Sequence, residues 1–202
     1  MSDRIFFLVA ILVAAVLVGL ALFPGMNRLP SGPVSGGNTD YTRIEISGKQ
    51  LNRMVAGAEH TTIELQEVDG QSVLYIEADS EALNGDPLRS PHFVLATDLE
   101  TVFAGRKLRV TVSARAADRY GAEGIQLDYA LGNSQASGWQ EFILTREFRE
   151  VSFDFNIPPR NAGSEPGYDY LAIAPVVPEK QRAMLVRWVT LEPIGPPIAA
   201  KE

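Results

Sequence analysis

The feature of this 202-residue sequence that most restricts its fold is an alternation of apolar and polar residues in many short segments. The clearest is the segment 106–116, in which Leu108, Val110, Val112 and Ala114 alternate with polar or charged residues. A period of two sends successive side chains to opposite faces of a β-strand, whereas an amphipathic helix needs a period near 3.6. The same period recurs in residues 41–46, 61–67, 72–78, 124–131, 150–156, 168–175 and 183–194.

Turn-forming residues separate these segments, as in "DGQS" (69–72), "NGDP" (84–87) and "YGAEG" (120–124). Short helical turns are expected only near residues 50–58 and 98–103. Many short alternating strands with turns between them are typical of an antiparallel β-sandwich. We therefore predict an all-β domain, an antiparallel sandwich, over residues 41–194.

Residues 5–23 form a separate apolar run without a polar side chain. As a helix this run is about 28 Å long, which matches the hydrocarbon core of a bilayer. The sequence predicts a single transmembrane helix, with residues 1–4 as a cytoplasmic tail because Arg4 precedes the run. The main domain then lies outside the cytoplasm, on the periplasmic face of a bacterial-type inner membrane. The anchor also makes membrane lipid a partner.

A cleaved signal peptide is the alternative, because Gly19, Leu20 and Ala21 place small residues at a spacing suited to cleavage. The length of the apolar run favours a retained anchor. Within it, small residues four positions apart form a spacing that lets membrane helices approach closely. The pairs are Ala10 with Ala14, and Ala15 with Gly19.

Residues 24–40, "PGMNRLPSGPVSGGNTD", are predicted to be a Pro/Gly linker. A flexible chain of this length holds the next domain about 20–25 Å from its anchor. Residues 195–202 are predicted to be a C-terminal tail.

Charge and cysteine content exclude several function classes. The formal net charge is −7, so the chain repels phosphate backbones and nucleic acid is not expected as a partner. The chain has no cysteine, which excludes disulfides, thiol catalysis and thiolate metal sites.

The order of the strand segments resembles that of the jelly-roll carbohydrate-binding modules of the galactose-binding-like superfamily. The resemblance rests on "FAGRKLRVTVSARA" (103–116), "GIQLDYAL" (124–131), "GWQEFILTREFREVSFDFNIPP" (138–159) and "AMLVRWVTLEP" (183–193). It implies a jelly-roll fold and a glycan-binding role. Many members hold calcium with acidic residues near the end of the last strand, but Arg187 stands in that region here and Glu192 alone does not make a site. No metal or other cofactor is expected.

Signs of catalysis are weak. The two histidines, His60 and His92, are not part of a serine-nucleophile or metal-binding motif. Paired carboxylates are the remaining possibility for a glycosidase, but the acidic residues have no supporting spacing and are interpreted as solvated surface. Those weighed are Asp118, Glu123, Asp128, Glu165 and Asp169. We therefore predict that the chain is not an enzyme.

Aromatic residues are the better candidates for recognition, because sugars stack on their flat faces. Trp139 is interpreted as part of the core or its rim. Trp188, expected on the same face as Met184 and Val186, is interpreted as packing. The predicted ligand-binding surface consists of Tyr120, Tyr168, Tyr170, Arg115 and Asp128.

Two functions remain open. The first is a membrane-anchored, non-catalytic recognition module that binds glycan. The second is an accessory subunit of a larger integral-membrane complex (respiratory, photosynthetic, secretion or envelope-synthesis), with the sandwich capping its periplasmic face.

Overall fold

The computed structural model describes residues 3–26, 28–37, 39–80, 86–132, 135–160 and 167–195, with the side chains of residues 22–26 left aside. The predicted C-terminal tail, apart from residue 195, lies outside the described residues, as do residues 1 and 2 of the predicted cytoplasmic tail. The chain divides into two compact units, Met1–Pro30 and Ser31–Glu202.

The first unit contains one helix, α1 (Asp3–Met26). Its segment Asp3–Ala21 has a mean hydropathy of 2.7 and none of it is buried. By length and composition this helix is able to cross a membrane, and a signal sequence near the N-terminus would meet the same criteria.

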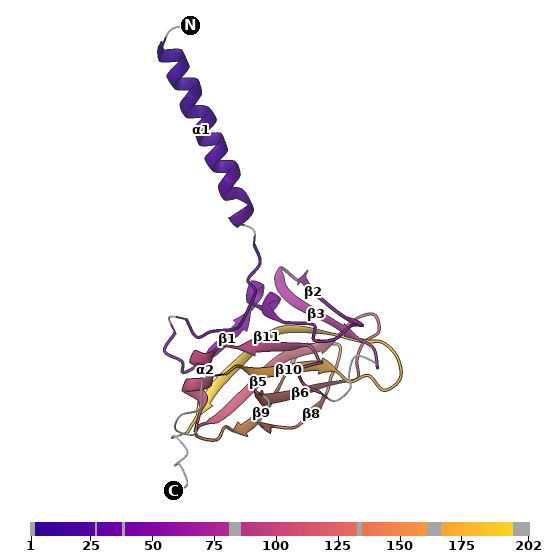
Figure 1. Cartoon of the computed structure of the whole chain (residues 1–202). Helices are drawn as coiled ribbons and strands as arrows, with labels where there is room; N and C mark the ends of the chain where they lie inside the picture. The colour runs from indigo at the N-terminus through magenta and orange to yellow at the C-terminus, as the bar shows by residue number, and fades with distance from the viewer. Residues whose placement is uncertain are drawn as a thin grey trace. The chain divides into compact units, whose positions relative to one another are not determined.

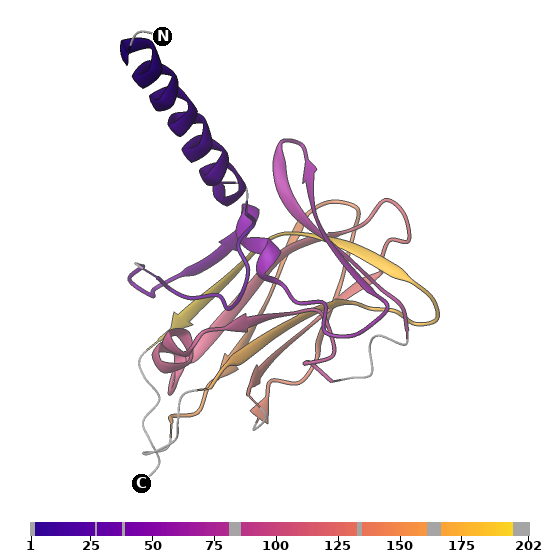
Figure 2. The ribbon, with the colours of Figure 1, turned by 45° about the horizontal axis from the view of Figure 1, so that its top comes forward.

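The second unit is the predicted antiparallel β-sandwich (Figure 1). One sheet has the order β2-β3-β11-β5-β9, and β1 also pairs with β11. The bounds of its strands are β1 (Ile44–Ser47), β2 (Thr61–Val68), β3 (Gln71–Ala78), β5 (Lys107–Ala116), β9 (Arg149–Asn156) and β11 (Arg182–Ile194). Figure 2 shows the β2–β3 hairpin standing out from this sheet. We call it the six-stranded sheet.

The other, five-stranded sheet has the order β4-β10-β6-β7, with β8 paired to β6. Its strands are β4 (His92–Leu95), β6 (Gly124–Leu131), β7 (Gln135–Ala136), β8 (Gln140–Ile143) and β10 (Asp169–Pro175). Two short helical elements join the strands, η1 (Gly48–Arg53) and α2 (Thr97–Phe103). The turn predicted at 98–103 thus coincides with α2, and that at 50–58 overlaps η1.

The core lies between the sheets and follows the period-two pattern. Leu108, Val110, Val112 and Ala114 of β5 are fully buried, as predicted. Their neighbours across β11 and β9 include Leu191 and Phe153, which pair with Val110. Burying one such aliphatic side chain contributes about 1.5–3 kcal/mol, so a repeated alternation fixes which face of each strand turns inward.

The folded unit begins at Ser31, so residues 31–40 of the predicted linker belong to it. Val34 is 5% exposed and forms an isolated bridge with Leu95, in which Val34 N donates to Val94 O at 2.7 Å. Arg53 Nη1 donates to the carbonyl oxygens of Ser31 and Pro33 at 2.9 and 3.0 Å. The composition of this segment indicates a linker because prolines and glycines dominate it. Its one buried apolar residue, Val34, does not stand out among them. We call residues 31–41 the strap.

Candidate functional site

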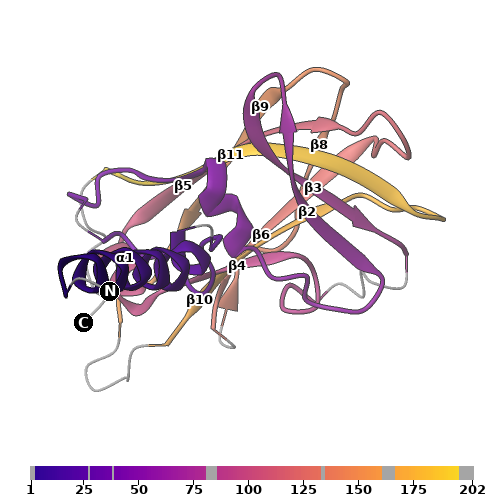
Figure 3. The same cartoon turned by 90° about the horizontal axis from the view of Figure 1, so that it is seen from above.

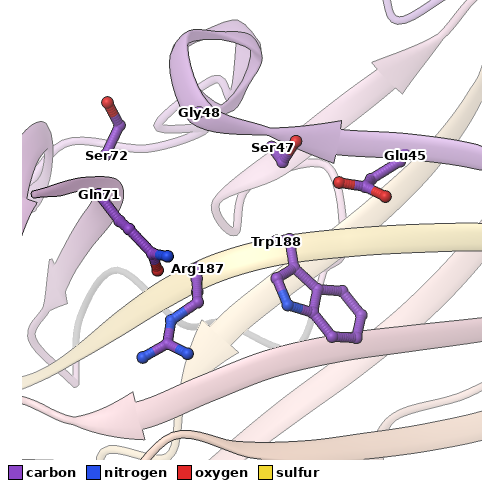
Figure 4. A pocket seen from close by; sticks show the side chains of 7 residues that line it. All are labelled: Glu45, Ser47, Gly48, Gln71, Ser72, Arg187 and Trp188. Carbon is purple, nitrogen blue, oxygen red and sulfur yellow. The ribbon is translucent and has the colours of Figure 1, made fainter.

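A β-bulge in β11 creates the most distinctive local geometry in the six-stranded sheet. Val186 lies opposite Ala114, but the next paired residue, Trp188, lies opposite Ser113, so Arg187 has no partner across β5. A bulge of this kind re-aims side chains, because two residues oppose one. Arg187 and Trp188 therefore both project from the outer face of the sheet, and Figure 4 shows them on the same side of the strand.

The prediction that Trp188 shares a face with Met184 and Val186 is therefore wrong. Met184 and Val186 are fully buried in the core, whereas Trp188 is partly exposed on the opposite face. A strict period of two carries the alternation straight through the bulge. The additional residue in the bulge moves each later side chain of β11 to the opposite face of the sheet. Val189 and Leu191, rather than Trp188, therefore lie in the core.

A gap along one edge of β11 opens above these two side chains. β3 pairs with β11 from Arg182 to Val186, and β1 pairs with it from Trp188 to Leu191, which leaves Arg187 between them. Figure 3 shows β11 running the length of the sandwich. The gap is a hollow of about 480 Å³ lined by Glu45, Ser47, Gly48, Gln71, Ser72, Arg187 and Trp188 (Figure 4). We call it the Trp188 groove.

Trp188 provides an aromatic surface in this groove. Its cross-strand neighbour Ser113 is 4% exposed and the nearby Thr190 is 2% exposed, although both point away from the core. Trp188 is the large side chain beside them, so the indole shields the sheet and leaves part of its own surface to solvent.

Arg187 is held by an aromatic ring. Its guanidinium carbon lies 3.8 Å from the centroid of Phe148, and Arg115 approaches the same ring at 5.4 Å. A cation over an aromatic face is attracted by the ring quadrupole, about 0.5–2 kcal/mol depending on exposure. Arg187 Nε is nevertheless buried without a hydrogen-bond partner among the described residues.

Two of the predicted site residues, Arg115 and Tyr120, lie toward one end of the six-stranded sheet. Arg115 is mostly buried and its Nη1 donates to Asp118 Oδ1 at 3.0 Å. Tyr120 is 59% exposed, in the loop after β5, with a φ of 54°. On the outer face of β3, the Tyr75 hydroxyl donates a hydrogen bond to Glu77. The pKa of Tyr75 is raised mainly by burial and in second place by this hydrogen bond.

The other three belong to the five-stranded sheet. Tyr168 is 47% exposed, and Tyr170 packs edge-to-face against His92, with ring centroids 5.6 Å apart. Asp128 is 2% exposed and accepts a hydrogen bond of 2.9 Å from Ser137 Oγ. Burial raises the pKa of Asp128, although the hydrogen bonds oppose this. The five residues are thus divided between the two sheets. The Asp128 carboxylate holds the turn that contains Ser137 through this hydrogen bond.

The small residues predicted to pack against another membrane helix lie on α1, apart from the sandwich. All four are exposed, and within the described chain none of them packs against a second helix. They are Ala10, Ala14, Ala15 and Gly19. The predicted contact of Ala10 and Ala14 with a partner helix is therefore not seen in this single chain, and the role of the four residues stays a prediction.

Three of the acidic residues considered as a catalytic pair each have a separate partner in the described structure. Asp118 pairs with Arg115. Asp128 faces outward from β6, whereas Asp169 faces the core and accepts a hydrogen bond from Tyr129. Glu165 lies outside the described residues. Within the described residues, no group of three or more His, Asp or Glu side chains is arranged to hold a metal ion.

Known structures share this fold. The CBM22-1 xylan-binding domain of Xyn10C from Paenibacillus barcinonensis matches with a TM-score of 0.52 and 13% identity, over 78% of this chain and 95% of that domain. A CBM22-1–GH10 fragment of Clostridium thermocellum xylanase Xyn10B, complexed with xylohexaose, matches at 0.47 and 15% identity. That match covers 70% of this chain and only 26% of the fragment.

A third match is a CBM4 structure, at 0.46 and 15% identity over 79% of this chain and 98% of that one. No family model matches the sequence. A search of curated proteins finds no match either. The match to the xylan-binding domain confirms the predicted jelly-roll β-sandwich fold.

Proposed function

We propose that this protein is a non-catalytic glycan-binding module attached to a membrane by α1, with the Trp188 groove as its binding site. The observation that carries the proposal is the combination of groove and fold. A partly exposed indole, a guanidinium, a carboxylate and an amide line one open hollow of about 480 Å³. The domain around it has the fold of carbohydrate-binding modules.

The chemistry of the groove suits a sugar. A pyranose presents a flat C–H face to an aromatic ring and hydroxyl groups around its rim. Trp188 supplies the ring, while Glu45, Gln71 and Ser47 supply acceptors and donors for hydroxyls. The carboxylates Asp118, Asp128 and Asp169, each engaged in its own contact, give no pair for glycosidic cleavage.

The proposed attachment rests on the apolar helix. Arg4, which directly precedes the apolar run of α1, favours an N-terminus in the cytoplasm and a sandwich on the periplasmic side of an inner membrane. The helix mediates the contact with lipid.

The test is a glycan array probed with the full chain in detergent, followed by calorimetric titration of the best ligand. Trp188→Ala should weaken binding at least tenfold, because stacking on an aromatic ring supplies much of the affinity for a sugar. Trp139→Ala, which removes the other tryptophan from the five-stranded side, should bind like the wild type. Binding that survives Trp188→Ala in a folded protein would reject the groove, and the absence of any glycan ligand would reject the function.

The accessory-subunit function is the second candidate, favoured by one feature of α1. A Cβ placed on Gly19 would meet no atom within 4 Å. Ala15 and Gly19 thus leave a face of the helix on which another membrane helix can pack closely. Mild detergent extraction of the native protein separates the candidates: co-migration with a defined integral-membrane complex supports the subunit, and migration alone supports the glycan binder.

A further inference from the structure

Arg187 differs from the other arginines on the outer face of the six-stranded sheet. Arg109 binds Asp154 through two nitrogens, at 2.8 and 3.0 Å. Arg43 pairs with Glu192 at 2.7 Å, and Arg115 pairs with Asp118. Arg187 has no carboxylate within 4 Å among the described residues, although it lines the groove. Arg187 is partly exposed and only its Nε is buried without a hydrogen-bond partner, so the guanidinium can offer charge-assisted hydrogen bonds to an anion from outside the chain.

The position of that charge is fixed in advance. The guanidinium carbon lies over the Phe148 ring, 3.8 Å from its centroid, and this contact restricts the rotation of the guanidinium. A planar guanidinium fixed in this way favours a carboxylate over a neutral hydroxyl, because carboxylate oxygens accept charge-assisted hydrogen bonds.

The groove also has two chemically different ends. Figure 4 shows Arg187 beside Gln71 at the β3 end, and Glu45 beyond Trp188 at the β1 end. Glu45 is exposed and makes no ion pair with a described residue. A carboxylate there repels a second anion but accepts hydrogen bonds from sugar hydroxyls. The ligand that satisfies both ends carries one negative group at one side of its ring and hydroxyls at the other.

We infer that the Trp188 groove selects acidic sugars, specifically a uronic acid unit whose carboxylate binds Arg187 while its ring stacks on Trp188 and its hydroxyls face Glu45. This inference rests on the proposed glycan-binding function and adds the class of ligand.

The experiment compares matched ligand pairs on the full chain in detergent. An array presents neutral oligosaccharides beside the same oligosaccharides with one hexose replaced by its uronic acid, for example cellobiose beside cellobiuronic acid. Arg187→Gln removes the charge and nearly preserves the polar character. Arg109→Gln removes the same charge from the same face, away from the groove, and is the matched control. Thermal unfolding checks that each variant is folded.

The wild type should bind the acidic member of a pair at least tenfold more tightly than the neutral one. Arg187→Gln should abolish that preference by weakening binding of the acidic member far more than binding of the neutral one, whereas Arg109→Gln should retain it. Equal binding of both members, or a preference that survives Arg187→Gln, overturns the inference and leaves the glycan-binding function standing. Binding to no member of either class overturns both.

Discussion

The Tyr129 hydroxyl donates a hydrogen bond of 2.8 Å to Asp169 Oδ2 inside the sandwich. Tyr129 is fully buried and Asp169 is 3% exposed. Burial raises the pKa of Asp169 to about 6, and the charge of Glu100 acts in the same direction. Glu100, on α2, accepts a bond from Gly167 N at 2.8 Å and lies 3.7 Å from Arg160. The core thus contains a carboxyl group that folding makes less acidic.

The first prediction concerns pH. Because the folded chain binds a proton at Asp169 more tightly than the unfolded chain, this stabilisation is complete below pH 3.8 and is lost as the pH rises through about 6. Asp169→Asn retains an oxygen acceptor for Tyr129 and removes the titration. We expect it to raise the free energy of unfolding at pH 7 by up to about 3 kcal/mol. Urea denaturation from pH 4 to 7 measures this.

Asp154→Asn is the control of opposite sign. Bonds from Arg109, only partly opposed by burial, lower the pKa of Asp154 to about 2, so its carboxylate stabilises the fold above pH 3.8. This pair is partly solvated, so its removal should cost less than about 1 kcal/mol. An Asp169→Asn variant that is less stable than the wild type at pH 7 would contradict the assignment.

The second prediction concerns the strap. Asp98 Oδ2 accepts hydrogen bonds from Ser35 Oγ, Gly36 N and Tyr41 Oη at 2.9, 2.8 and 3.1 Å. Asp98→Ala should cost about 1–3 kcal/mol, because it leaves these donors without a partner. The amides of Val34 and Ala96 should then exchange hydrogen faster.

Asp40→Ala provides the comparison in the same region. Asp40 is exposed, and among the described residues its side chain accepts hydrogen bonds from Thr42, two positions along the chain. Its removal should change stability by less than about 0.5 kcal/mol. Equal effects of the two substitutions would show that Asp98 does not hold the strap.

The third prediction concerns a close approach of two backbones. Gly57 has a φ of 83°, and a Cβ there would collide with the carbonyl oxygens of Arg89 and Ser90. Gly57→Ala should therefore destabilise the domain by about 3 kcal/mol or more, through strain and overlap together. Gly70→Ala introduces comparable strain, at a φ of 74°, into open space, and should cost about 1 kcal/mol. Thermal unfolding of the pair isolates the overlap.

The fourth prediction concerns the contribution of Arg187 to the stability of the fold. Methionine at this position gives up the contact with Phe148 but removes the unpaired buried Nε. These effects nearly cancel, so Arg187→Met should leave the free energy of unfolding within about 1 kcal/mol of the wild type or raise it. Arg109→Met breaks a two-bond contact with Asp154 and should lower it slightly. A loss above about 2 kcal/mol for Arg187→Met would indicate that the guanidinium supports the fold.

The sequence was informative wherever one local rule applied. The alternation in residues 106–116 predicts both β5 and its buried face. Successive side chains of a strand point to opposite faces, so a strand with one buried face shows a period of two. The alternation failed at Arg187, where a single unpaired residue changes the face of Trp188. A bulge is decided by the pairing of β11 with β5, β1 and β3, and those partners are distant in the chain.

The strap and the groove were missed for the same reason. Val34 becomes a core residue only because Leu95 and Val94 offer it an open strand edge. Gln71 and Glu45 line the same groove as Arg187 only because two separate strands share one edge of β11. Charged and glycine neighbours predict that Tyr120 is exposed, and the structure confirms it. Such local sequence patterns do not tell which exposed residues become neighbours, and the part of the tyrosines in binding stays a prediction.

Because residues 31–41 pack onto the folded domain, the connection between α1 and the domain is shorter than the sequence suggests. The helix ends at Met26 and the folded unit starts at Ser31, so only residues 27–30 remain between them. Four residues extend at most about 14 Å. With α1 inserted in a membrane, as proposed, so short a connection would keep the domain close to the bilayer surface. The domain would then meet lipid-linked or membrane-adjacent polymers at high effective concentration, and polymers farther away would remain out of its reach.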